Sequence, residues 1–325
     1  MTARNITRTD QASSCYFRTT ADGGTRKALV QIDERCNLHC AHCFVSATRA
    51  GQSMPYDGIT GLLIPRLKAC RVERVTLTGG EPTIHPRFTE IVRALRGAGM
   101  QVGFCTNATT LTDAQISELA GIGGVHANAS LAEDEEYREL CEFAAGNGAS
   151  YVLMNPLSSM GRGVKSRGKL SSGEEHMRRI RALTAPFDSP DLEIVHIRFP
   201  STAGQPLAGC EAGTIIYVFT AGEVTVCPYL VFAARTPQSR HDPGEFIVGN
   251  IFTDPDIAAR LDAYRFTERY EMGANPTCRS CGIAGQCGKG CPAAVIAAGE
   301  RIGAVDAEVC PVTSGERRLL PVMPA

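Results

Sequence analysis

Three closely spaced cysteines, in the stretch Cys36–Cys43 with the sequence CNLHCAHC, constrain this chain more than any other feature. Gaps of three and then two residues separate them, a spacing that can supply thiolates to three corners of a four-iron four-sulfur cube. The fourth iron then has no protein ligand and is free to hold a small molecule. Spacing alone leaves a zinc knuckle or a ferredoxin fragment as alternatives, because cysteine triplets also bind zinc.

The residues around the cysteines favour an α/β fold. An apolar run, Ala28–Ile32, leads directly into the first cysteine, and a second run, Val75–Leu77, ends in the sequence TGGEP at 78–82. Both motifs therefore follow predicted strands. Loops that follow strands are where α/β barrels place their chemistry.

These two motifs, in this order and at strand ends, resemble the radical S-adenosylmethionine (radical SAM) superfamily, whose signature is CX3CX2C followed by a GGEP-type strand end. The resemblance covers most of the chain and implies a partial, six-stranded (β/α) barrel with SAM at the carboxyl ends of the strands. It implies that SAM chelates the open iron and that the GGE motif holds the methionyl ammonium. The implied cluster ligands are Cys36, Cys40 and Cys43. The implied ammonium-binding residues are Gly79, Gly80 and Glu81.

Strand-like and helix-like patterns alternate along the chain, which predicts βαβ units and a parallel sheet. The predicted strands are 27–33, 72–78, 101–107, 125–130, 151–155 and 192–199, with helices at 58–69 and 87–98. One short acidic helix lies between Ser130 and Tyr151, so the barrel is predicted to be about one βα unit short, with residues omitted near Leu131–Glu135. The predicted division is an N-terminal arm at 1–26, a radical SAM core at 27–199, and a cluster-binding domain with a tail at 200–325.

The rest of the SAM pocket follows from the resemblance by position. Asn107 ends the third strand in a TN turn, and Ser130 ends the fourth in NASL, where a ribose contact is usual. Asn155 and Leu157 follow the strand whose end usually touches adenine. The alternative is that Asn and Ser at strand ends only cap turns.

A second set of cysteines resembles the SPASM extension of some radical SAM enzymes, with the pattern CX9-15GX4C, gap, CX2CX5CX3C, gap, C. One implied auxiliary cluster is held by Cys278, Cys281, Cys287 and Cys310. The other is held by Cys210, Cys227 and Cys291. The fourth site of this second cluster is left undecided among an open iron, water or substrate, and Glu211. A zinc ribbon is the alternative for the whole set.

Composition limits the partners and the compartment. The net charge is −1 and no long basic block occurs, which predicts no nucleic-acid or membrane surface. No export signal or membrane span is found, so the protein is predicted to be cytoplasmic. Fourteen cysteines in such a chain indicate metal binding rather than disulfides. The predicted cofactors are three 4Fe-4S clusters and SAM, with a flavodoxin- or ferredoxin-type electron donor.

Several other residues receive a hypothesis. Cys105 alternates with Asn107 on one predicted strand, so its thiol is a candidate hydrogen-atom donor inside the barrel, with packing as the alternative. His196 and Arg198 form a candidate site for an anionic group, with a salt link as the alternative. The basic stretch Arg162–Lys169 is predicted to be a solvated loop. Three further cysteines are interpreted as a spare thiol and two packing residues, namely Cys15, Cys70 and Cys141.

The resemblance implies reductive cleavage of SAM and removal of a hydrogen atom from a substrate C–H bond. Only 35 residues precede Cys36, too few for a fused leader-binding module. That favours a small polar metabolite (a sugar, aminocyclitol or nucleoside antibiotic intermediate), with dehydrogenation, epimerisation or decarboxylation as the outcome. The alternative is maturation of a ribosomally made peptide, by cross-linking or oxidation, with a separate leader-binding partner. An electron carrier is disfavoured, because the GGE motif would then have no purpose.

Overall fold

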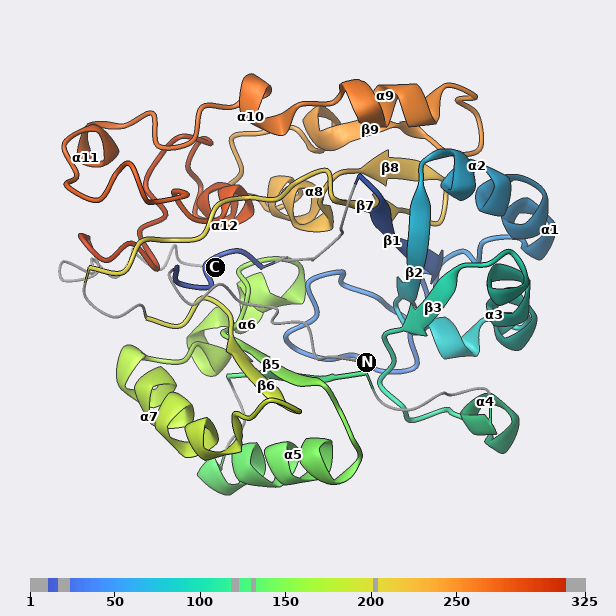
Figure 1. Cartoon of the computed structure of the whole chain (residues 1–325), viewed down its shortest axis with the longest axis horizontal. Coiled ribbons are helices and arrows are strands. Elements are labelled where there is room, and N and C mark those ends of the chain that lie inside the picture. The colour runs from blue at the N-terminus through green and yellow to red at the C-terminus, as the bar shows by residue number, and fades with distance from the viewer. Residues whose placement is uncertain (1–10, 17–23, 118–122, 130–132, 201–203, 314–325) are drawn as a thin grey trace.

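Two β-sheets with helices on their outer faces make up the protein (Figure 1). This computed structural model describes residues 11–16, 24–117, 123–129, 133–200 and 204–313. The larger sheet has the strand order β3-β2-β1-β7-β8-β9, and the smaller has the order β4-β5-β6. The strands of the larger sheet are β1 (Arg26–Asp33), β2 (Val72–Gly79), β3 (Gln101–Phe104), β7 (Ile215–Val218), β8 (Glu223–Thr225) and β9 (Ile247–Asn250). Those of the smaller sheet are β4 (Val125–Asn128), β5 (Tyr151–Asn155) and β6 (Glu193–His196).

The helices lie between and after these strands. Those of the first half are α1 (Tyr56–Gly58), the π-helical turn η1 (Ile59–Leu63), α2 (Ile64–Ala69), the 3-10 turn η2 (Pro82–Ile84), α3 (Phe88–Gly97), α4 (Asp113–Ser117) and α5 (Asp134–Gly146). Those that follow are α6 (Arg162–Leu170), α7 (Glu174–Thr184), η3 (Ala185–Phe187), α8 (Pro228–Ala234), η4 (Pro243–Phe246), α9 (Ile257–Ala263), α10 (Phe266–Arg269), α11 (Pro276–Arg279) and α12 (Pro292–Ala297). No helix among the described residues is both long and apolar enough to cross a membrane.

The first six strands are parallel, which confirms the predicted α/β class and the partial barrel. β1 pairs with β2 and β2 with β3, while β4 pairs with β5 and β5 with β6. In the described part of the chain β3 and β4 do not pair, so the barrel is open between them. The single helix α5 joins β4 to β5, which are direct neighbours. The predicted omission of residues near 131–135 falls partly on residues 130–132, outside the described residues, and stays a prediction.

Two predicted strands are shorter than the sequence indicates. β3 ends at Phe104 instead of 107, and β6 ends at His196 instead of 199. Beyond β6 the backbone is left-handed at Arg198, with φ 57°. Such a conformation interrupts an extended strand. The side chains of 105 and 107, and those of 196 and 198, are therefore not related by strand alternation, because each pair runs past the end of its strand.

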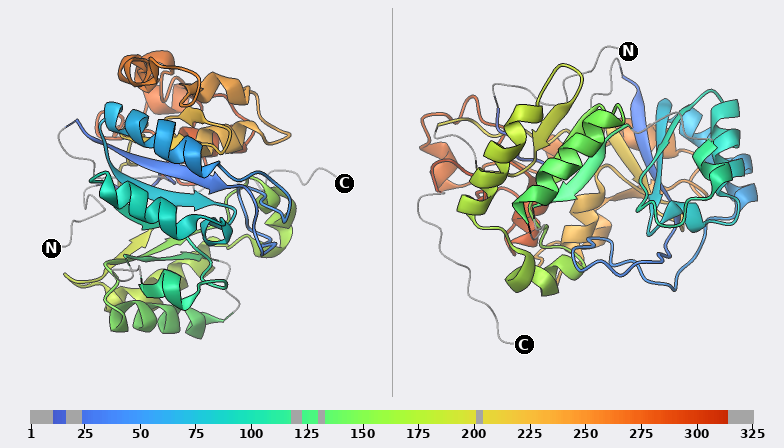
Figure 2. Two further views of the ribbon diagram at one scale, coloured as in Figure 1. Left: turned by 90° about the vertical axis from the view of Figure 1, so that its right-hand side faces the viewer. Right: turned by 90° about the horizontal axis from the view of Figure 1, so that it is seen from below.

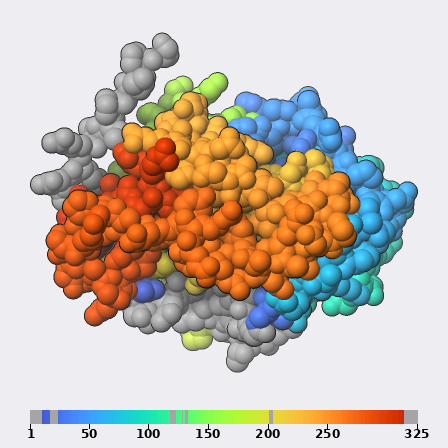
Figure 3. All heavy atoms as spheres, turned by 90° about the horizontal axis from the view of Figure 1, so that it is seen from above, coloured from blue at the N-terminus to red at the C-terminus, as the bar shows by residue number. Residues whose placement is uncertain are grey.

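The C-terminal third continues the larger sheet. β7 pairs in parallel with β1, and β8 and β9 follow as antiparallel strands. Because β1 has a strand on each side, its central residues are buried, as an apolar run in a parallel sheet should be. Helices α8 and α12 pack against each other beside this sheet. Figure 3 shows these C-terminal residues, orange to red, covering much of the upper face next to the N-terminal half.

Each sheet has its own hydrophobic core. The larger core joins β1, β2 and β7 to α2, α3, α8 and α12, and includes Ile32, Leu77 and Phe232. The smaller core lies between β4–β6 and helices α5 and α7, and includes Tyr137 and Met154. Figure 2 shows α5 and α7 on the outer side of the small sheet. Both cores leave the carboxyl ends of the parallel strands free to carry loops.

A buried ion pair joins three distant parts of the chain. Arg198, whose side chain is 0% exposed, donates to both carboxylate oxygens of Asp306, over 2.8 and 2.9 Å. The same guanidinium donates to Ser14 O over 2.8 Å, and it also pairs with Glu308. The end of β6, the N-terminal segment and the C-terminal region are thereby fixed together.

Replacement of Arg198 by Met is expected to lower the free energy of unfolding by about 3–5 kcal/mol, because Asp306 would keep a buried and uncompensated charge. The measurement is anaerobic urea unfolding of the two proteins. The matched control is Arg178→Met, whose salt bridge to Glu175 is exposed on both sides and should be worth at most about 1 kcal/mol. Equal losses for the two variants would contradict a special role for the buried pair.

Candidate iron-sulfur and cofactor site

The cysteine loop, residues 36–48, follows β1 and is closed at its base. The Cys36 N–H donates to Thr48 O over 2.7 Å, and within the loop the Cys43 N–H donates to Cys40 O over 3.2 Å. The Leu38 N–H donates to Cys36 Sγ over 3.4 Å, a contact of the kind that tunes cluster sulfurs. Burial raises the pKa of the Cys36 thiol, and bound metal would displace its proton. Three thiols in one closed loop fit a cluster with one open corner.

The GGE motif is bound directly to the backbone that leads into the cysteine loop. The Gly80 N–H donates to Asp33 O over 2.9 Å, and the Glu81 N–H donates to Arg35 O over 2.8 Å. A Cβ atom at Gly80 would lie 2.2 Å from Arg35 O, and one at Gly79 would lie 2.0 Å from Asp33 O. Only glycine permits this approach, so the motif and the cysteine loop form one unit.

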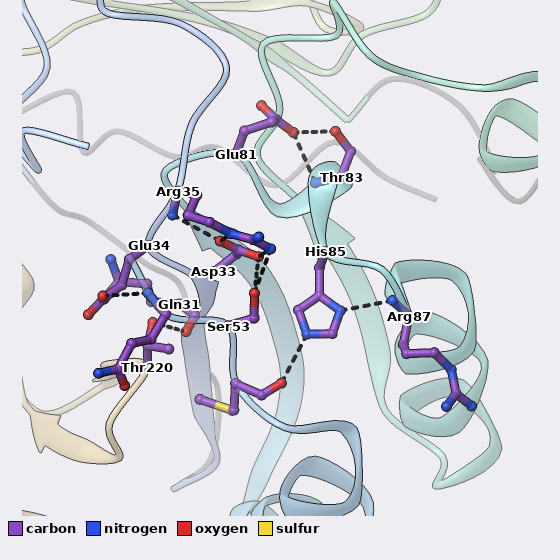
Figure 4. Close-up of polar contacts among 12 residues, drawn as sticks. Gln31, Asp33, Glu34, Arg35, Ser53, Glu81, Thr83, His85, Arg87 and Thr220 are labelled. Carbon is purple, nitrogen blue, oxygen red and sulfur yellow. Dashed lines mark hydrogen bonds and ion pairs between the residues drawn. The ribbon is translucent and has the colours of Figure 1, made fainter. Parts of the chain in front are cut away.

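Glu81 is buried and joins the ends of β2 and β3. Its Oε1 accepts hydrogen bonds from the Thr83 N–H, the Thr83 hydroxyl and the Thr106 hydroxyl, over 3.1, 2.6 and 2.7 Å. Its Oε2 accepts from the Asn107 N–H over 2.8 Å. Figure 4 shows the bonds to Thr83 at the start of η2. The carboxylate therefore first of all holds the two strand ends together, and a bound ammonium would be an additional partner.

A second carboxylate supports the base of the cysteine loop (Figure 4). Asp33 is buried and accepts from Arg35 Nη2 over 2.7 Å and from the Ser53 hydroxyl over 2.6 Å. Burial tends to raise its pKa, but these hydrogen bonds and the Arg35 charge outweigh that effect and hold the pKa below its ordinary value. Asp33 is thus charged at neutral pH and keeps the chain on either side of the loop in place.

Helix α6 clamps the cysteine loop from the opposite side, which corrects the prediction of a solvated loop at 162–169. Arg162 donates from Nε to Cys40 O over 2.8 Å and from Nη1 to Ala47 O over 2.6 Å. The Ser166 hydroxyl donates to Ala41 O over 2.8 Å. The sequence of 162–169 is basic and has no apolar stripe, so it did not predict that this segment packs on the cysteine loop. The bonding partners are backbone carbonyls far away in sequence, which leave no pattern to recognise.

The other predicted SAM contacts are placed unequally. Asn107 lies beside the cysteine loop, where its Nδ2 donates to Asn37 Oδ1 over 3.0 Å and lies 3.9 Å from Cys36 Sγ. Asn155 ends β5, and its carbonyl accepts from the Ala129 N–H over 2.7 Å. Leu157 is buried next to Gly163 of α6. Ser130 lies outside the described residues. The roles of all four in binding SAM stay predictions.

Cys105 directly follows β3, and its side chain is accessible to solvent. Its N–H donates to Leu77 O over 2.9 Å, which holds it beside β2. The thiol interacts electrostatically with Lys27 of β1, Tyr151 of β5 and Tyr217 of β7. These three residues belong to strands of both sheets.

His196 and Arg198 do not form an anion site. His196 Nε2 lies 2.9 Å from the Thr184 hydroxyl, and burial together with nearby Arg181 lowers its pKa to about 4, so it is neutral at pH 7. Arg198 makes the buried ion pair with Asp306. The alternative of a salt link is therefore observed for Arg198, whereas His196 is bonded to a hydroxyl. Asp306, which sequence reasoning missed, also accepts from the Cys291 N–H over 3.0 Å, and its carbonyl accepts from the Cys310 N–H over 3.0 Å.

Three auxiliary cysteines line one pocket between the C-terminal loops and α8 and α12. They are Cys210, Cys227 and Cys291. Cys227 and Cys291 directly precede α8 and α12, which pack together. Burial raises the pKa of Cys210 to about 12. No group of three metal-binding side chains in the described ranges converges on a single ion.

The remaining four cysteines lie in the turns around α11 and after α12. Cys278 is in α11, where its N–H donates to Asn275 Oδ1 over 2.9 Å, and the Cys281 N–H donates to Cys278 O over 3.4 Å. Cys287 Sγ accepts from the Lys289 N–H over 3.4 Å. Cys310 is fixed by Asp306. All four thiols are partly exposed, and the cluster that they are predicted to hold stays a prediction.

Residues 30–151, from β1 to the start of β5, match the Radical SAM superfamily. With the three-cysteine loop, the GGE motif and the partial barrel all in place, the chain carries a domain of the radical SAM superfamily, which implies an enzyme. Membership implies a 4Fe-4S cluster and SAM as cofactors, and Cys36, Cys40 and Cys43 are the residues that fit this cluster.

Several known proteins are similar to this chain. Mycofactocin maturase MftC of Mycolicibacterium smegmatis is 24% identical over 334 residues, covering 86% of this chain and 81% of that protein. PqqA peptide cyclase of Bradyrhizobium diazoefficiens is 33% identical over 110 residues, or 33% of this chain and 29% of the relative. The structure of Streptococcus suis SuiB bound to S-adenosylmethionine has a TM-score of 0.62 at 16% identity and covers 86% of this chain and 76% of SuiB. The chain spans only 27–34% of the length of three curated relatives that it matches, the PqqA peptide cyclase among them.

Replacement of Arg162 by Ala is expected to slow SAM-dependent formation of 5′-deoxyadenosine by about 10–100-fold, because residues that orient cluster ligands affect activity to this extent. The measurement is the rate of product formation by reduced, reconstituted enzyme. The control is Arg167→Ala, on an exposed position of the same helix, which should leave the rate unchanged. An unchanged rate in both variants would show that α6 does not support the cysteine loop.

Proposed function

We propose that this enzyme modifies a ribosomally made peptide, by removing a hydrogen atom from a peptide C–H bond and forming an oxidised or cross-linked product. The observation that carries the proposal is the similarity to a mycofactocin maturase over 86% of the chain. A match of that length must extend from the SAM core into the C-terminal cysteine region. We also propose that the C-terminal cysteines hold two auxiliary clusters and that a separate protein binds the leader part of the peptide.

Two further comparisons support a peptide substrate. One relative, which matches a third of this chain, is named a PqqA peptide cyclase. SuiB, which shares the fold, has also been solved bound to a precursor peptide, SuiA. Relatives that match only about a third of the chain include GTP 3′,8-cyclases and a nucleotide dehydratase, so the SAM core alone does not select the substrate.

The cluster and SAM, when bound, supply reductive cleavage of a sulfonium and a radical that removes hydrogen. The chain's own residues position these groups. Cys36, Cys40 and Cys43 hold the cluster in a loop closed by Thr48 and clamped by Arg162. Glu81 keeps the ends of β2 and β3 together. Because these contacts are formed before substrate arrives, the site is preorganised and little ordering remains to be done on binding.

The source of the abstracted hydrogen tests the proposal. Anaerobic reaction mixtures would contain enzyme, SAM, a reductant and one fully deuterated probe. The probe is either a synthetic precursor peptide encoded beside the gene or a panel of sugars and aminocyclitols. We expect deuterium in 5′-deoxyadenosine only with the peptide, and a peptide product lighter by two hydrogen atoms. Transfer from a sugar or aminocyclitol, or none from the peptide, would overturn the proposal. Cys40→Ala is the control that should form no 5′-deoxyadenosine.

Cys105 gives the substrate radical a second possible fate. A carbon that has lost hydrogen either loses a further electron and a proton, or receives a hydrogen atom from a donor. The accessible Cys105 thiol, whose backbone is held beside β2, is the proposed donor. The thiyl radical that remains on Cys105 takes one electron from the added reductant and one proton from solvent, which restores the thiol. Its hydrogen exchanges with solvent, so reaction in D2O labels any substrate that it quenches.

Replacement of Cys105 by Ala is expected to remove solvent deuterium from the recovered peptide while formation of 5′-deoxyadenosine continues. The measurement is mass spectrometry of peptide recovered from D2O. Cys70→Ala, a buried thiol at the end of α2, is the matched control and should keep the wild-type label. Equal labelling in the wild type and the Cys105 variant would dismiss the thiol as the donor.

A further inference from the structure

Cys15 is buried between two loops that carry auxiliary cysteines. Its side chain belongs to a residue only 3% exposed, and its Sγ lies 3.3 Å from Gly209 O and 3.5 Å from Gly290 O. Gly209 and Gly290 immediately precede Cys210 and Cys291. Sequence analysis assigned Cys15 no function, because nothing near it in the chain forms a motif.

The same pocket is lined by four thiols. Cys15 joins Cys210, Cys227 and Cys291 around it. Most of the remaining lining is apolar, with Glu211 as the other candidate ligand at the rim. Glu211 is exposed, whereas Cys15 is enclosed. Iron-sulfur clusters take thiolate ligands, so Cys15 has both the better position and the better chemistry.

The backbone around Cys15 is fixed on both sides. The Ala12 N–H donates to Pro206 O over 2.8 Å, and the Ala208 N–H donates to Ala12 O over 3.0 Å. Ser13 and Ser14 carbonyls accept from Arg198, through its N–H over 2.7 Å and its Nη1 over 2.8 Å.

The residue after Cys15 is held by aromatic packing. The ring of Tyr16 stacks on Tyr229, which lies two residues after Cys227, with centroids 5.0 Å apart. The Arg198 guanidinium lies 5.0 Å from the centroid of the same Tyr16 ring. Because the residues on both sides of Cys15 make contacts of their own, the backbone holds the Cys15 thiol at the pocket.

Close backbone packing brings the two ligand loops to this thiol. A Cβ atom at Gly288 would lie 2.1 Å from the Gly209 backbone nitrogen, so only glycine permits the approach. Asp306 accepts from the Cys291 N–H and from Arg198, which in turn holds Ser14. One buried ion pair therefore positions both Cys15 and Cys291.

We propose that Cys15 is the fourth ligand of the auxiliary cluster held by Cys210, Cys227 and Cys291. Four thiolates fill the four corners of a cube and leave no open iron. This cluster then passes electrons and does not bind substrate. The inference does not depend on whether the substrate is a peptide.

The test is whether an external ligand reaches an iron of the auxiliary clusters. ¹³C-cyanide binds an open iron, and saturating SAM blocks the open iron of the Cys36–Cys43 site. We therefore expect reduced wild-type enzyme with SAM to show no ¹³C coupling by electron-nuclear double resonance. Cys15→Ala should either gain a ¹³C coupling or lose about four irons per chain. Cys141→Ala, a buried thiol in the other core, should behave like the wild type.

Two results would overturn the proposal. One is ¹³C coupling in the wild type with SAM bound, which would mean that an auxiliary iron is already open. The other is a Cys15→Ala protein with wild-type iron content and no coupling. If the Ala variant does not fold, Cys15→Ser keeps a small polar group, and the wild-type measurement still decides whether the iron is open. An iron content of about four per chain in the wild type would remove the auxiliary clusters altogether.

Discussion

The approach of β1 to β2 at their carboxyl ends is the constraint on which the candidate site depends. Backbone bonds from Gly80 and Glu81 reach Asp33 and Arg35, the residues that lead into the first cluster cysteine. A side chain at Gly80 would collide with Arg35 O. A cofactor bound to the GGE motif is therefore held at a fixed distance from the iron of the adjacent loop. Without this contact, the cysteine loop and the cofactor-binding turn would move independently.

The C-terminal region is tied to the SAM core by packing as well as by the shared sheet. Phe44, next to Cys43, stacks on Tyr229 with centroids 5.0 Å apart, and Tyr229 stacks on Tyr16 at the same separation. These three rings run from the first cysteine loop to the auxiliary pocket. Both cysteine sites are therefore parts of one packed unit, although the residues that form them are far apart in sequence.

Short motifs allowed the site to be predicted where its residues are close in the chain. The cysteine triplet, the GGE motif and the parallel strands around them all follow from local spacing and apolar runs. The shortened β6 could not be predicted, because the left-handed Arg198 makes its contacts with Ser14 and Asp306, which are far away in sequence. Arg162, Asp306 and Cys15 were missed for a related reason. Each of these side chains contacts a segment more than a hundred residues away in sequence, and none of them belongs to a motif. Asp306 in addition contacts Cys291, which is close to it in sequence.

The most direct test of the central claim concerns the iron next to Cys36, Cys40 and Cys43. Reduced enzyme would be mixed with SAM labelled with ¹⁵N in its amino group and ¹⁷O in its carboxylate, and studied by electron-nuclear double resonance. We expect hyperfine coupling from both labels to the cluster, since both groups should bind the open iron. SAM bound to the protein without either coupling would contradict an open iron at this site.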